Sequence, residues 1–117
     1  MSKYFVAIDI GGTKISVCFF KKNIIVKKKK FKTSNFGPSS LINIRNYLLI
    51  NIKDIAAIGI ATTGLIHKKK WSTLNRNMIG SFDKFPIVNF FRKKFNTPIF
   101  AIGDTHAASL GELYFGK

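Results

Sequence analysis

The order of apolar and polar positions divides the chain into short strand-like segments separated by turns. Apolar runs that are rich in β-branched and aromatic residues and bounded by glycine, proline or asparagine predict buried strands. Such runs occupy residues 4–10, 15–20, 23–32, 55–61 and 97–102. The first three follow each other through tight connections and therefore predict an antiparallel meander. The fourth is apolar without interruption, which predicts a strand buried on both faces.

Apolar residues recur at helical spacing in three further segments, which are 41–52, 86–95 and 105–115. Ser39 or Ser40 is available as the N-cap of the first helix, and Pro86 suits the first turn of the second. The connecting segments are a loop at 34–40 and a polar hairpin at 64–73. The resulting order is βββαβ, a polar excursion and then αβα. This order predicts an α/β fold in which a mixed sheet carries its crossover helices.

Composition bounds the size and the partners of the protein. A chain of 117 residues is long enough for one ordinary domain and too short for a two-domain enzyme. Its net charge of +15 suggests a polyanion partner such as nucleic acid. However, 17 of the 20 basic residues are lysine, and the runs 27–30 and 68–70 lack interleaved stacking aromatics. We therefore interpret the charge as a solvated surface rather than a nucleic-acid interface.

Cysteine usage and hydropathy indicate a cytoplasmic protein. Cys18 is the only cysteine, so the chain holds neither an internal disulfide nor a cysteine-based metal site. No apolar run is long enough for a signal peptide or a membrane span, so we expect no membrane partner. His67 and His106 have no further ligands at metal-binding spacing and predict no metal site.

The first candidate site lies where the first predicted strand ends. Its residues are Asp9, Ile10, Gly11, Gly12, Thr13 and Lys14. The two glycines let the backbone approach a ligand and direct N–H groups at phosphate oxygens, while Thr13 adds a hydroxyl and Lys14 a cation. Asp9 is placed to hold a hydrated Mg²⁺. The alternative is a plain hairpin turn, for which a Gly-Gly pair is well suited.

Two further candidates lie closer to the carboxyl end. Asp104 follows the strand at 97–102, a position from which a carboxylate can act as general base toward a bound hydroxyl. The alternative role for Asp104 is the N-cap of the helix at 105–115. Asn77 belongs to a polar loop at 74–80, which either presents amides to sugar hydroxyls or forms an ordinary turn.

Together these segments resemble the ROK family of sugar kinases, and they do so nearly from end to end. The matching segments are 7–14 (AIDIGGTK), 58–66 (IGIATTGLI), 74–80 (LNRNMIG), 85–88 (FPIV) and 102–112 (IGDTHAASLGE). By this resemblance the fold is the ribonuclease H-like N-terminal lobe that is shared with actin and hexokinases. Residues 1–117 would form that single lobe, and the C-terminal lobe would be absent.

The resemblance also implies an activity, which is ATP-dependent phosphorylation of the 6-hydroxyl of N-acetylmannosamine in sialic acid catabolism. The segment Asp9–Lys14 would bind ATP, with Asp9 on the Mg²⁺ side. Asp104 would be the catalytic base toward the sugar hydroxyl, and Gly64 and Asn77 would lie near the sugar. Three alternatives remain, namely a ROK glucokinase or fructokinase fragment, a non-catalytic basic module, and a split enzyme. The repressor branch of the family is disfavoured, because its helix-turn-helix would precede the phosphate motif.

The sequence departs from the family pattern in two respects. Gly103 stands where the family usually has an asparagine that contacts the sugar, so the resemblance implies the loss of one sugar contact. In addition, the family's second phosphate loop and the ligands of its structural zinc would follow Lys117. One lobe supplies one wall of a kinase cleft. We therefore expect the isolated chain to be inactive unless a homodimer or a complementing C-terminal lobe completes the site.

Overall fold

The computed structural model describes residues 3–11, 14–32, 37–51, 54–73 and 82–103. Within these ranges the chain forms eight strands and two helices. They are β1 (Tyr4–Ile10), β2 (Lys14–Lys21), β3 (Ile24–Lys32), α1 (Gly37–Asn51), β4 (Ile55–Thr62), β5 (Leu65–His67), β6 (Lys70–Thr73), β7 (Phe82–Phe85), α2 (Ile87–Arg92) and β8 (Ile99–Gly103). The helix expected at 105–115 lies outside the described residues.

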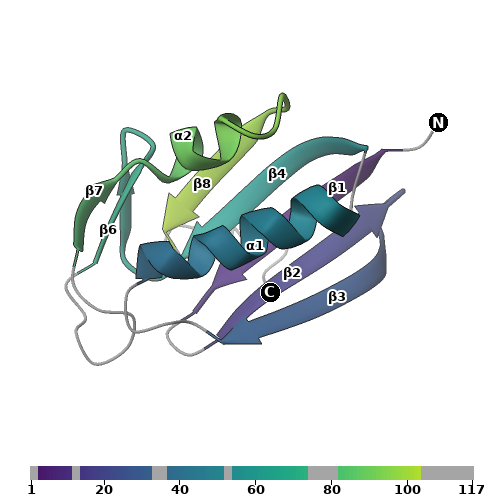
Figure 1. The fold of residues 1–117 in the computed structure, drawn as a ribbon, viewed down its shortest axis with the longest axis horizontal. Helices are drawn as coiled ribbons and strands as arrows, with labels where there is room; N and C mark the ends of the chain where they lie inside the picture. Colours follow the sequence, from purple (N-terminus) through teal and green to yellow (C-terminus); the bar gives the residue numbers. More distant parts are fainter. Residues whose placement is uncertain (1–2, 12–13, 33–36, 52–53, 74–81, 104–117) are drawn as a thin grey trace, which may run out of the picture.

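The main sheet has five strands in the order β3-β2-β1-β4-β8. Strands β1, β2 and β3 pair in antiparallel fashion, which confirms the predicted meander. Strand β4 lies parallel to β1, and β8 lies parallel to β4 (Figure 1). The fold is therefore α/β with a mixed sheet, as predicted from the order of the elements.

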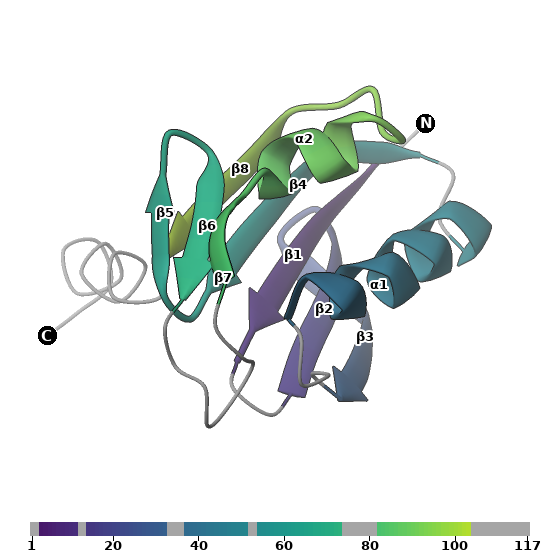
Figure 2. The ribbon, with the colours of Figure 1, turned by 60° about the vertical axis from the view of Figure 1, so that its left-hand side comes forward.

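Both described helices lie on the same face of this sheet, with α1 across β1 and β2 and α2 beside β8 (Figures 1 and 2). We call this the covered face. Alternate strand residues point into it and are buried, because successive side chains of a strand point to opposite faces. Its buried strand residues are Val6, Ile8, Ile10, Ile15, Val17, Phe19, Ile58, Ile60 and Ile99. They pack against buried residues of the two helices, which are Leu41, Ile44, Leu48, Ile87, Val88 and Phe91.

The opposite face, here called the open face, carries no helix among the described residues. It is formed by the intervening strand positions, which are Phe5, Ala7, Asp9, Lys14, Ser16, Cys18, Lys28, Lys30, Lys32, Ala57, Gly59, Ala61, Phe100 and Ile102. In β4, residues 55–57 are half-buried, and from Ile58 to Thr62 buried and half-buried positions alternate. The prediction that this strand is buried on both faces is therefore wrong for the part of the molecule that the structure describes. Small residues, rather than buried ones, make its second face look apolar in the sequence.

A second sheet, β5-β6-β7, lies beside α2 and the end of β8 (Figure 2). The β5–β6 hairpin confirms the polar hairpin predicted at 64–73, and Lys68 and Lys69 take the two positive φ angles of its turn. Trp71 is fully buried and donates from Nε1 to the carbonyl oxygen of Thr63 at 2.8 Å. Strand β7 was not predicted, because its sequence FDKF is short and half charged.

The helix boundaries differ from the predicted ones at three ends. Helix α1 begins at Gly37, so the loop predicted at 34–40 is wrong from Gly37 onward, and Ser40 lies within the helix instead of capping it. Pro38 explains this start, since proline is favoured in the first turn, where its missing N–H has no helical partner. Helix α2 spans only Ile87–Arg92, with Pro86 at its N-cap and Lys93 at its C-cap.

Candidate phosphate and sugar site

The carboxyl ends of β1, β4 and β8 meet at one edge of the main sheet. Because β4 is parallel to both neighbours, all three strands point the same way (Figure 1). Ile10 pairs with Thr62, and Thr62 pairs with Gly103, so the last residues of the three strands form one row. Ligands of open α/β sheets bind outside this edge. The candidate site therefore lies at this row of strand ends.

The first predicted motif, residues 9–14, covers the end of β1, the β1–β2 turn and the first residue of β2. The Gly11 N–H donates to the carbonyl oxygen of Lys14 at 2.9 Å, so this amide is engaged within the turn. A Cβ atom on Gly11 would lie 3.1 Å from the same oxygen, a distance that only a shift of backbone would relieve. Gly12 and Thr13 lie outside the described residues. Lys14 is exposed at the start of β2, next to the turn.

The two residues before this turn point to opposite faces of the sheet. Asp9 is exposed on the open face. The Ile10 side chain is 1% exposed within the core, so any contact that Ile10 makes with a phosphate must come from its backbone. Its carbonyl oxygen already accepts the N–H of Thr63 at 3.0 Å. This hydrogen bond ties the β1–β2 turn to the turn between β4 and β5.

Gly64 and Gly103, which the sequence analysis considered separately, lie in close contact. Gly64 occupies the β4–β5 turn with a φ of 93°, a conformation that favours glycine. A Cβ atom on Gly103 would lie 2.7 Å from the Gly64 carbonyl oxygen. An asparagine at position 103 would therefore collide with the backbone of this turn. Glycine therefore suits the local packing at this position, and the asparagine that the resemblance led us to expect would need a shift of the Gly64 backbone.

Two threonine hydroxyls at the end of β4 escaped the sequence analysis. The Oγ1 atoms of Thr62 and Thr63 are both buried, and neither has a hydrogen-bond partner in the structure. Most buried polar groups in proteins are hydrogen-bonded, so an unpartnered one at a strand end is a potential contact for a polar ligand or water. The signal in the sequence was the Thr-Thr pair that closes an otherwise apolar strand.

The remaining predicted site residues, Asp104 and Asn77, lie outside the described residues. Asp104 immediately follows Gly103 in the chain. In the described part no group of three or more His, Cys, Asp or Glu residues could hold a metal ion. Mg²⁺ commonly uses one or two carboxylates together with water and substrate phosphates. The exposed Asp9 carboxylate at the end of β1 fits that mode of binding.

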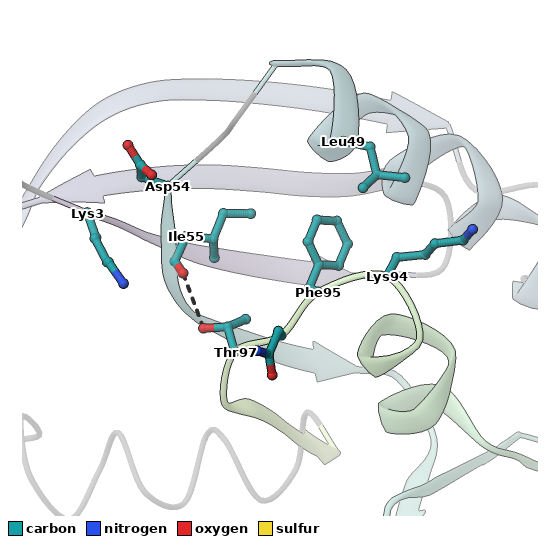
Figure 3. Close-up of a pocket in the computed structure, with 8 residues that line it drawn as sticks. Lys3, Leu49, Asp54, Ile55, Lys94, Phe95 and Thr97 are labelled. Carbon is teal, nitrogen blue, oxygen red and sulfur yellow. Dashed lines mark hydrogen bonds between the residues drawn. The ribbon is translucent and has the colours of Figure 1, made fainter.

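A cavity of about 470 Å³ lies at the other end of the sheet (Figure 3). Its lining includes Lys3, Asp54, Phe95 and Thr97, and none of the predicted site residues. The Thr97 hydroxyl donates toward the carbonyl oxygens of Ile55 and Ala56, at 3.2 Å and 2.5 Å. These hydrogen bonds attach the segment before β8 to the start of β4. The cavity and the candidate site therefore lie at opposite ends of the sheet. No helix in the described ranges combines the length and apolar character of a membrane span.

Comparison with known proteins gives consistent similarities. The chain is 29% identical over 111 residues to the N-acetylmannosamine kinase of Salmonella newport (strain SL254), a match that covers 92% of this chain and 38% of that relative. In structure it resembles a ROK family glucokinase from Streptomyces griseus in complex with glucose and AMPPNP, with a TM-score of 0.74 and 24% identity, covering 97% of this chain and 37% of the other.

It also resembles a ROK family transcriptional regulator that is a homolog of the E. coli MLC protein, with a TM-score of 0.74 and 16% identity, covering 96% of this chain and 30% of the other. These structural likenesses establish the actin- and hexokinase-like fold of the N-terminal lobe. The chain thus spans well under half the length of the proteins it matches. The model of the ROK family matches residues 5–117, and the chain belongs to the ROK family.

Proposed function

We propose that residues 1–117 supply the N-terminal lobe of an ATP-dependent sugar kinase whose substrate is N-acetylmannosamine. The observation that carries the proposal is the alignment of three strand ends at one sheet edge, where Ile10, Thr62 and Gly103 form a continuous row. The fold alone does not decide the function, because a transcriptional regulator of the family shares it. The kinase assignment therefore rests on the residues of this edge.

Each element of the edge suits one part of phosphoryl transfer. The β1–β2 turn with Lys14 is suited to the phosphates of ATP, since glycine backbone and a cation are the usual means of holding them. Asp9 would hold Mg²⁺, which neutralises charge on the phosphates when bound. The sugar hydroxyl would lose its proton to Asp104 as its oxygen bonds to the γ-phosphorus and ADP departs. Phosphoryl transfer needs mainly positioning and charge neutralisation, which this set supplies.

The choice of N-acetylmannosamine is supported by the Salmonella relative, with which 92% of this chain aligns. The buried hydroxyls of Thr62 and Thr63, together with the Gly64 turn, lie on the side where we place the sugar. A glucose or fructose kinase is the alternative within the same reaction class. We further propose that the isolated chain is inactive, because the kinase cleft lies between two lobes, and that a C-terminal lobe, covalently linked or separate, completes it.

The experiment is a measurement of ADP release by a chimera in which residues 1–117 replace the matching part of the Salmonella relative. We expect turnover with N-acetylmannosamine to exceed turnover with glucose or fructose. Asp104→Asn should lower kcat by a factor of about 10² to 10⁴, which is the usual contribution of a general base. Asp54→Asn is the matched control, because Asp54 lies at the opposite end of the sheet.

Equal turnover of the three sugars would reject N-acetylmannosamine as the specific substrate. Full activity of the Asp104→Asn chimera would reject Asp104 as the base. Robust turnover by the 117-residue chain alone would contradict the proposed need for a second lobe.

A further inference from the structure

The lysine run of β3 is divided between the two faces of the sheet. Lys27 and Lys29 point to the covered face, where their Nζ atoms lie 5.6 Å and 5.8 Å from the ring centres of Tyr47 and Phe31. Such contacts hold a cation against an aromatic face. The alternate lysines of the strand, which are Lys28, Lys30 and Lys32, are exposed on the open face. The run is therefore two separate rows with different surroundings.

The open-face row ends beside the β1–β2 turn. The pairing of β2 with β3 places Lys32 directly opposite Lys14 and Lys30 directly opposite Ser16. Lys14 and Lys32 are both exposed. Two like charges directly opposite each other on neighbouring strands destabilise a sheet. This pair therefore carries an electrostatic cost in the absence of an anion, and an anion bound between the two ammonium groups would remove it.

The described strands offer few acidic groups to offset that charge. Among the five strands of the main sheet, Asp9 is the only acidic residue. Asp9 on β1 pairs with Ser16 on β2, and Ser16 pairs with Lys30 on β3. Strand β2 therefore lies between Asp9 and Lys30. Among the described strand residues, a single carboxylate faces three lysines at this corner, Lys14, Lys30 and Lys32, so these strands give it a net positive charge.

We propose that Lys32 and Lys14 together form a two-cation clamp for the phosphate chain of a nucleoside triphosphate, with Lys30 adding to the local field. This rests on the proposed function and extends the site, because Lys14 is the only lysine that the sequence predicts to bind phosphate. Lys32 is far from the glycine motif along the chain, and only the strand register brings the two together. The two ammonium groups approach the phosphates from different strands, so neither replaces the other.

The test measures binding of tripolyphosphate and of ATP to the 117-residue chain by calorimetry, without sugar. The variants are Lys14→Gln, Lys32→Gln and Lys28→Gln, which all change the net charge equally. Lys28 is the matched control, since it lies on the same face of the same strand but about 13 Å from Lys32. We expect Lys14→Gln and Lys32→Gln each to weaken binding about three- to tenfold, and Lys28→Gln to have little effect. The differences between the variants should shrink in about 0.5 M salt, because the Debye length is then only about 4 Å.

A second measurement separates the clamp from a structural role. Without ligand, Lys32→Gln should leave the melting temperature unchanged or raise it, because it removes the repulsion from Lys14. With tripolyphosphate, the rise in melting temperature should be smaller for Lys32→Gln than for the unmodified chain.

The possible outcomes distinguish this inference from the proposed function. If Lys14→Gln weakens binding and Lys32→Gln does not, the clamp is wrong while the phosphate site stands. If Lys28→Gln and Lys32→Gln weaken binding equally, a diffuse charge effect replaces the clamp. If the unmodified chain binds neither tripolyphosphate nor ATP, both the clamp and the proposed phosphate site are wrong.

Discussion

The two faces of the main sheet are built from the same strands but do different work. On the covered face, the buried residues of β1, β2 and β4 are apolar side chains that pack against the helices, except for the polar Thr62 at the end of β4. On the open face, the intervening positions carry small residues, lysines, Asp9 and a few larger apolar residues such as Phe5 and Phe100. Because the period of a strand is two, one strand can supply the core with one set of side chains and a ligand with the other. The apolar core and the charged candidate groups are thus on opposite sides of one layer of backbone, whereas the buried Thr62 hydroxyl lies on the covered side.

The phenylalanine residues also differ in exposure between the two faces. Phe19 and Phe91 are fully buried on the covered side. Phe5 and Phe100, on the open face, are 54% and 65% exposed. Residues of the same type therefore contribute very unequally to the free energy of unfolding. Substitutions matched between the faces test this directly.

The largest expected effect is that of Phe19→Ala on the covered face. Removing a fully buried phenyl ring should lower the free energy of unfolding by about 3–5 kcal/mol, through lost burial and the cavity left behind. Phe100→Ala, the matched substitution on the open face, should cost less than about 1 kcal/mol. Urea denaturation of both variants measures the difference. Similar losses for the two variants would mean that the open face is packed as tightly as the covered one.

An intermediate effect is expected at Gly103, where the two sheets approach each other. Gly103→Ala should lower the free energy of unfolding by about 1–3 kcal/mol, because its Cβ would press on the Gly64 backbone. Gly103→Asn, which restores the family's residue, should cost at least as much. Thermal unfolding compares the two variants with the unmodified chain. A stable Gly103→Asn chain would show that the β4–β5 turn moves aside easily.

The smallest effect is expected for Gly59→Ala, in the middle of β4. A Cβ atom there would meet nothing within 4 Å, so the added methyl group has room on the open face. The substitution should change stability by no more than about 0.5–1 kcal/mol, in the stabilising direction, because alanine loses less backbone entropy on folding. Chemical denaturation of Gly59→Ala and Gly103→Ala gives the change in the free energy of unfolding for each variant. The comparison separates the steric effect of the added methyl group from its effect on backbone entropy. A clear loss of stability at Gly59 would show that something covers that strand.

Much of the fold could be predicted because it depends on local patterns. Strand β1 was predicted with its observed bounds, and the meander followed from apolar runs joined by tight turns. The start of α1 was missed because Pro38 and Ser40 read as loop residues in isolation, although both suit a first helical turn. Strand β7 was missed because four residues with two charges carry no periodic signal.

The site could be predicted only in part, since its key contacts join residues that are distant in the sequence. The glycine motif at Gly11 was visible locally. The approach of Gly103 to Gly64 depends on how β5 lies against β8, and the pairing of Lys32 with Lys14 depends on strand register. No local pattern specifies either contact. Gly103 was accordingly interpreted as a lost sugar contact, whereas the structure also gives it a steric role.

The two peptide groups that flank Thr63 determine whether residues can be inserted or deleted in the β4–β5 turn. The Thr63 N–H is bonded to Ile10 in the main sheet, while its carbonyl oxygen accepts the Trp71 indole of the second sheet. A residue inserted or deleted between Thr62 and Gly64 would break one of these bonds, because a single residue spans both. The Lys68–Lys69 turn has no such double attachment among the described contacts. Natural length variation should therefore collect at the tip of that hairpin and spare its base.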